Sequence, residues 1–146
     1  MMPAESMPDR IQAMFAGTHP SPAYDRHMGF RLVSWSPQGA VVEAEAGGHF
    51  TNPAGVLHGG VLAGLADSAM GLTTLGLVAP GESTTNTDLH IRFLRPTTAG
   101  TLRATARVLR RGRRTMALEC DVADEQGRLV ARASSSFLVL ADGAAR

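Results

Sequence analysis

Lysine is missing from this chain of 146 residues, and cysteine occurs once, at Cys120. All 14 basic residues are therefore arginines. The missing lysine excludes a lysine Schiff base and the lysine of a phosphate-binding P-loop. A single cysteine excludes an intrachain disulfide and a cysteine-based zinc cluster, so small disulfide-rich domains and zinc ribbons are not candidates.

Excess charge and long apolar runs are missing as well. The formal net charge is +1, whereas a nucleic-acid-binding domain of this size is usually clearly basic. Residues 68–81 carry no charge, but these 14 residues are too few to cross a bilayer. The first ten residues include Glu5 and Asp9 and do not resemble a secretory signal. We therefore expect a cytoplasmic protein of one folded domain, with no nucleic-acid or membrane partner.

The beginning of the chain predicts one short helix and two strands. Residues 9–17 are amphipathic, and Ser6 and Asp9 have the spacing of a capping box. Residues 30–36 and 40–46 are modest strand candidates, and the second alternates apolar residues with glutamates. A helix followed by two strands is therefore expected before residue 47.

The stretch 59–79 is too long for one strand and is apolar nearly all round, which is typical of a buried central helix. Its single ionisable side chain is Asp67. A buried carboxylate costs several kcal/mol unless it is satisfied. Asp67 could be the N-cap of a helix that begins near Ser68, or could form an ion pair with an arginine of the sheet. It could also be a general base or nucleophile whose pKa is raised by burial.

The second half of the chain predicts an antiparallel sheet. Four segments have a two-residue hydrophobic period, and the short turns between them indicate antiparallel neighbours. One face of this sheet must cover the helix, so the sheet has to curl around it. We expect an α+β fold with a four-stranded meander. The four segments are 85–94, 101–110, 115–123 and 128–140.

The residues before the central helix have the sequence NPAGVLHGG, at positions 52–60. Gly59 and Gly60 allow another group to approach the backbone closely. The free N–H groups and positive dipole end of a helix that begins here would bind phosphate or polarise a carbonyl. His58 is either a structural hydrogen-bonding group or part of a catalytic site. No two histidines have the spacing of a metal-ligand pair, so no metal site is predicted.

The segment NPAGVLHGGVLAGLADSAMG, followed by TDLHIRFLRP, resembles the hotdog-fold acyl-CoA thioesterases of the phenylacetate-degradation (PaaI-like) type. The likeness extends over residues 30–140. It implies a long helix wrapped by an antiparallel sheet, dimers that pair side by side, and active sites at the dimer interface. Such pairs commonly form tetramers. We expect an N-terminal segment at 1–28, the hotdog domain at 29–140 and a flexible tail at 141–146.

The same resemblance implies roles for four residues. Asp67 matches the acid on the helix, which serves as base or nucleophile. Gly59 matches the glycine whose backbone N–H polarises the thioester carbonyl, and His58 matches the histidine that helps to position this site. Asn52 matches an asparagine that orients the carbonyl or the attacking water.

Other substrate contacts are expected from residues that match the family pattern less closely. Asn86 lies where many relatives carry a serine or threonine that holds the water, and Thr85 and Thr87 are alternatives for that role. The backbone at Gly60 is a further candidate for substrate binding. Arginines suit the phosphates of coenzyme A, because they form forked hydrogen bonds. The candidates are Arg95 and, in the run 110–114, Arg113 and Arg114. That run could equally be a solvated hairpin tip.

We therefore expect an acyl-CoA thioesterase that needs no cofactor and releases an aryl or medium-chain acid. Small residues on the central helix, such as Gly71, could leave room for the acyl group, or could only permit close packing. Two other functions use the same fold: binding of acyl-CoA without catalysis, and hydration or dehydration of an acyl-CoA. The spacing H-G-G-x6-D favours the thioesterase.

Overall fold

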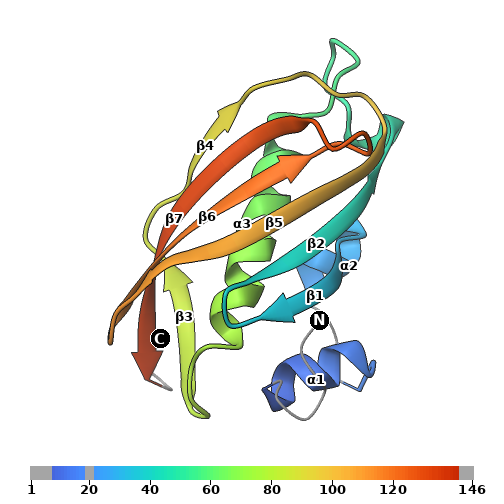
Figure 1. Cartoon of the computed structure of the whole chain (residues 1–146). Coiled ribbons are helices and arrows are strands. Elements are labelled where there is room, and N and C mark those ends of the chain that lie inside the picture. Colours follow the sequence, from blue (N-terminus) through green and yellow to red (C-terminus); the bar gives the residue numbers. More distant parts are fainter. Residues whose placement is uncertain (1–7, 19–21, 142–146) are drawn as a thin grey trace.

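The computed structural model describes residues 8–18 and 22–141. Its centre is helix α3 (Gly59–Leu75), and a seven-stranded antiparallel sheet curls around it in the hotdog arrangement that we predicted (Figure 1). The strand order is β1-β2-β5-β6-β7, and both β3 and β4 pair with β7. The strands are β1 (Arg31–Ser36), β2 (Gly39–Ala46), β3 (Glu82–Asn86), β4 (His90–Phe93), β5 (Gly100–Arg111), β6 (Thr115–Ala123) and β7 (Leu129–Ala141).

The core lies between α3 and the concave face of the sheet. Alternate residues of β2, β5, β6 and β7 point inward, so that β5 buries Leu102 and Ala104 against the helix. Trp35 of β1 is 2% exposed, and its indole N–H donates to the carbonyl oxygens of Leu72 (3.1 Å) and Thr73 (3.3 Å). The sheet therefore holds the second half of α3 through hydrogen bonds as well as through packing.

From the central helix onward, the fold differs from the sequence prediction in three respects. The central helix begins at Gly59, as predicted, but ends at Leu75. The segment 85–94 is two strands, because the residues between β3 and β4 leave the ladder: Ser135 Oγ donates to the Asp88 carbonyl (2.6 Å). The predicted meander is correct for β5, β6 and β7 only, since β3 pairs with β7 and β5 pairs with β2.

The N-terminal region contains two short helices. The first, α1 (Asp9–Phe15), confirms the predicted helix, but its N-cap is Pro8, and no side chain in the part of the chain that the structure describes caps it. The predicted capping box is therefore wrong, and Ser6 lies outside the described residues. The second helix, α2 (Ala23–Met28), was not predicted. No helix in the described ranges is long and apolar enough to cross a membrane.

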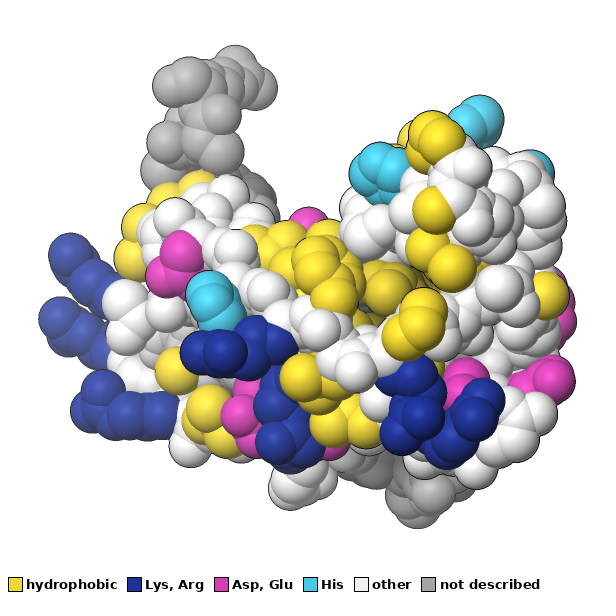
Figure 2. Space-filling model, turned by 90° about the horizontal axis from the view of Figure 1, so that it is seen from above, with side chains coloured by type: hydrophobic (Ala, Val, Ile, Leu, Met, Phe, Trp, Pro, Cys, Tyr) yellow, Lys and Arg dark blue, Asp and Glu magenta, His cyan; other side chains and the backbone are white. Residues whose placement is uncertain are grey.

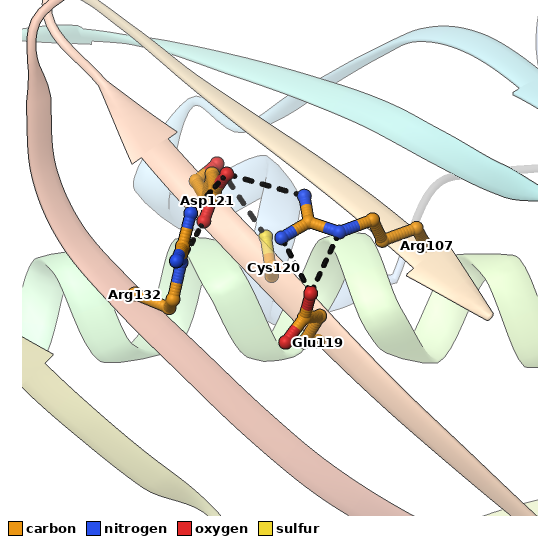
Figure 3. A network of polar contacts seen from close by, with 5 residues as sticks. All are labelled: Arg107, Glu119, Cys120, Asp121 and Arg132. Carbon is orange, nitrogen blue, oxygen red and sulfur yellow. Dashed lines mark hydrogen bonds and ion pairs between the residues drawn. The ribbon is translucent and has the colours of Figure 1, made fainter. Parts of the chain in front are cut away.

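The outer face of the sheet carries a network of ion pairs (Figure 3). Arg107 of β5 contacts Glu119 (2.6 Å) and Asp121 (3.2 Å) of β6, and Arg132 of β7 contacts Asp121 (2.6 Å). These cross-strand pairs hold three neighbouring strands in register. Cys120, between the two acids, is fully buried on the other face, and burial raises the pKa of its thiol to about 12.

Candidate active site

The loop before α3 fixes the first turn of the helix. The Asn52 side-chain oxygen accepts hydrogen bonds from the backbone N–H groups of Ala54 (2.9 Å) and Val56 (3.4 Å). His58 is the N-cap, and its Nδ1 accepts the N–H of Gly60 (2.9 Å). The N–H of Gly60 is thus already used by His58, and in the described chain the N–H of Gly59 has no hydrogen-bond partner. Gly59 is therefore the free donor at this helix end.

A cavity of about 450 Å³ opens beside this helix end, and we call it the N-terminal cavity. Its lining includes Asn52, Gly59, Phe93, Leu94 and Arg95, so three of the predicted site residues come together here. A Cβ on Gly59 would lie 2.8 Å from Cζ of Phe93, which shows how closely that ring approaches the bare backbone. On the face seen from above, hydrophobic side chains gather in a hollow with histidines at its rim (Figure 2).

Asp67 lies two turns further along α3, where it is half-buried. The amide Nδ2 of Asn86, the last residue of β3, donates to its Oδ1 (2.8 Å). Burial raises the pKa of the Asp67 carboxyl, the Asn86 hydrogen bond opposes the rise, and the negative charge of Asp25 adds to it. Asp67 is not an N-cap, because the helix begins at Gly59, and its partner is an amide rather than an arginine. Both structural explanations of Asp67 are therefore wrong.

A second cavity, of about 390 Å³, opens beside Asp67, and we call it the acid cavity. Its polar side includes Asp67, Asn86 and Thr85. Its apolar side is formed by residues of α3, of β7 and of the segment before and within α2. Thr87 does not line it, because its N–H (2.9 Å) and hydroxyl (3.4 Å) both donate to the carbonyl of Ser136. The apolar and aromatic lining is Pro22, Tyr24, Leu72, Leu75 and Phe137.

Sequence reasoning missed the contribution of α2 to this cavity. Pro22 and Gly29, which has a φ of 70°, delimit a helix of only six residues, too short to show a hydrophobic period. Pro22 and Gly29 were the sequence features from which the two ends of this helix could have been predicted. Asp25 of this helix lies in the acid cavity with Asp67. No group of three metal-ligating side chains lies together in residues 8–18 and 22–141.

The two parts of the predicted site are separated along the helix. Asp67 lies eight residues after Gly59, which corresponds to about 12 Å along the axis of α3. A base and a carbonyl-polarising donor must each lie about 3 Å from the reacting groups. Within one chain, Asp67 and the free N–H of Gly59 therefore cannot act on the same thioester.

The predicted coenzyme A arginines lie at opposite ends of the molecule. Arg95 lines the N-terminal cavity. Arg113 and Arg114 lie in the exposed turn between β5 and β6, and the guanidinium of Arg111 in the same run donates to the carbonyl of Leu77, just beyond the C-terminal end of α3. The turn is thus at the other end of the helix from Gly59 (Figure 1).

Comparisons with known proteins show the family to which the chain belongs. Residues 54–131 match the model of the thioesterase superfamily. The chain belongs to this superfamily. This thioesterase is 30% identical over 103 residues to a 1,4-dihydroxy-2-naphthoyl-CoA hydrolase of Listeria monocytogenes, a match that covers 70% of this chain and 84% of that protein.

Solved structures of the superfamily have the same fold. The PaaI protein of the phenylacetic acid degradation operon of E. coli superposes with a TM-score of 0.80 at 27% identity, over 91% of this chain and 92% of that one. A phenylacetic acid degradation-related protein of Ralstonia eutropha gives a TM-score of 0.84 at 28% identity, over 89% and 99% of the two chains. The protein is thus a PaaI-like thioester hydrolase.

Proposed function

We propose that this thioesterase hydrolyses an aryl- or medium-chain acyl-CoA to the free acid and coenzyme A, with Asp67 as general base. One observation carries the proposal: a half-buried carboxylate with a raised pKa opens into a cavity and has, among the described residues, a single amide partner. Asn86 holds Oδ1 of Asp67, which leaves Oδ2 free to take a proton from water. The water would then attack the thioester carbon.

The carbonyl oxygen of the thioester would accept a hydrogen bond from the free N–H of Gly59. This donor lies at the positive end of the α3 dipole, and a single donor of this kind is worth ~3–4 kcal/mol in acyl transfer. Asn52 has amide N–H groups to orient the same carbonyl, because only its oxygen is used by the loop. His58 would act indirectly, since its hydrogen bond to Gly60 shapes this helix end.

Because Gly59 and Asp67 are about 12 Å apart along one helix, we propose that each site combines Asp67 of one chain with Gly59 of a second copy. The open edge of β4 is suited to such a dimer. Among the described residues β4 pairs with β7 alone, and Leu89, Phe93 and Leu94 around it are 39%, 56% and 54% exposed. A partner at this edge would continue the sheet and cover these side chains. Following the family resemblance, we propose that two such dimers form a tetramer.

The acyl group would enter the acid cavity. Asp67, Gly71 and Leu75 lie four residues apart and so share one face of α3, which leads from the base to the apolar lining. A Cβ placed on Gly71 would meet no atom within 4 Å, so this position is open space that an acyl group could fill. The nucleotide would remain outside, at Arg95 or at Arg113 and Arg114.

Release of free thiol from a panel of acyl-CoA thioesters tests the proposal. We expect thiol release by the native protein and a loss of at least ~10²-fold in kcat for Asp67→Asn, with an unchanged circular dichroism spectrum. Hydration of an enoyl-CoA without thiol release would instead identify a hydratase. Binding without turnover would identify an acyl-CoA-binding domain. Unchanged turnover in folded Asp67→Asn would remove Asp67 from the mechanism.

A further inference from the structure

A second carboxylate, Asp25 of α2, is buried in the acid cavity. Asp25 is 4% exposed, and its Oδ1 accepts a hydrogen bond of 2.6 Å from the hydroxyl of Ser68. The described residues provide no hydrogen bond to its Oδ2 and no ion pair to either oxygen. One oxygen of Asp25 is therefore held by α3, and the other has no hydrogen-bond partner among residues 8–18 and 22–141.

Stability alone does not account for a carboxylate in this place. Burial without a cationic partner disfavours the ionised form, and burial raises the pKa of Asp25 while the Ser68 hydrogen bond only opposes the rise. An apolar residue or an alanine at this position of α2 would avoid the cost. Groups that destabilise a fold in this way are characteristic of functional sites.

Asp25 and Asp67 are coupled through the cavity that they share. Ser68, which binds Asp25, directly follows Asp67 on α3. The lining from α2, α3, β3 and β7 includes one further titratable group, Tyr24, and no arginine or histidine. No cation of the lining therefore screens the repulsion between the two acids, and the charge of Asp25 raises the pKa of Asp67.

We propose that Asp25 is a positioning residue of the active site whose negative charge makes Asp67 a stronger base. Ser68 holds the Asp25 carboxylate on the cavity wall, and that charge increases the affinity of Asp67 for the proton that it takes from the attacking water. This inference rests on the proposed function, in which Asp67 is the base.

The pH dependence of kcat/KM tests the proposal. Asp25→Asn keeps an oxygen that can accept the Ser68 hydroxyl and removes the charge. We expect its acid limb to shift to lower pH, and its plateau kcat to fall ~3-fold because the base is weaker. Asp25→Glu should keep the native limb. Asp9→Asn, an exposed acid on α1, removes the same charge outside the cavity and should change neither value.

Other outcomes separate this inference from the proposed function. An acid limb that stays in place in Asp25→Asn, while Asp67→Asn is inactive, would overturn the role of Asp25 alone. Full activity of Asp67→Asn would overturn the proposed base and the inference together. If Asp25→Asn does not fold, Asp25→Ser is the second neutral variant. Carboxyl ¹³C titration of Asp67 in the unliganded protein gives the same comparison without turnover, and an unmoved midpoint would again refute the coupling.

Discussion

Two inactive variants should restore activity when they are combined in one dimer. The first is Gly59→Pro, which removes the free backbone N–H. Proline is favoured at the first position of a helix, and His58 before it has φ −63° and ψ 133°, which a following proline accepts. The second variant is Asp67→Asn. Gly59→Ala is the matched control, because it brings a Cβ equally close to Phe93 but keeps the N–H.

The expected magnitude follows from the separation of about 12 Å between the two groups along α3. Gly59→Pro alone should lower kcat by ~10²–10³-fold, the range for one oxyanion-hole donor. Random pairing of equal amounts gives about one half heterodimers, and each heterodimer has one intact site and one doubly impaired site. The mixture should therefore recover about one quarter of native activity.

Thiol release by the unmixed variants and by the co-refolded mixture is the assay, and two affinity tags verify that heterodimers form. A mixture that contains heterodimers but shows only the summed activity of the two variants would refute the shared site. Each site would then use groups of its own chain. If Gly59→Ala were as inactive as Gly59→Pro, the loss would come from the clash with Phe93 and not from the missing N–H.

Three further changes test other parts of the structure. Replacing Arg113 and Arg114 with Gln should raise KM for acyl-CoA more than it lowers kcat. The rise in KM should shrink as the salt concentration increases and should be absent for a thioester that lacks the nucleotide. An unchanged KM for acyl-CoA would favour Arg95 as the residue that binds coenzyme A. Gly71→Leu should fold and should lower kcat/KM for aryl-CoA relative to acetyl-CoA; an unchanged ratio would place the acyl group elsewhere. The pKa of Asp25 is raised in the folded state, so the stability of the native protein should fall as the pH rises from the ordinary carboxyl pKa through the raised value. In urea unfolding, Asp25→Asn should therefore be more stable than the native protein at pH 8 but not at pH 4. An equal gain in stability at both pH values would contradict this.

Sequence analysis predicted the helices and strands that have a clear hydrophobic period. It did not predict the elements whose period is too short or continues across a break. The start of α3 at Gly59 and the isolated acid at Asp67 were readable, because the helix is apolar and its first residues are glycines. The alternation of residues 85–94 continues across the break between β3 and β4, so the pattern predicts one strand. Asp88 interrupts it through bonds to Ser135 and the Ser136 N–H, which are long-range contacts.

Several residues that line the two cavities, such as Asn52, Gly59 and Asp67, could be named from the sequence, but their arrangement in space could not be predicted. Spacing gives the separation of Gly59 and Asp67 only once the helix is established. The expectation that the active site lies at a dimer interface came from the family resemblance and not from this spacing. Asp25 was missed because α2 has six residues and no period of its own. Its proximity to Ser68 depends on how α2 packs against α3, which is a tertiary contact.

Because Cys120 is buried, the folded protein should not react with reagents that detect thiols. With a pKa of about 12, its thiolate fraction near pH 8 is only about one in 10⁴, and the side chain is fully covered. Coenzyme A released in solution would therefore react with a disulfide reagent while the protein would not. Since the chain also lacks lysine, ordinary amine labels would find no side chain to modify. A new cysteine placed on the surface would thus be the single reactive side-chain thiol, and a probe attached there would report on one chosen position of each subunit.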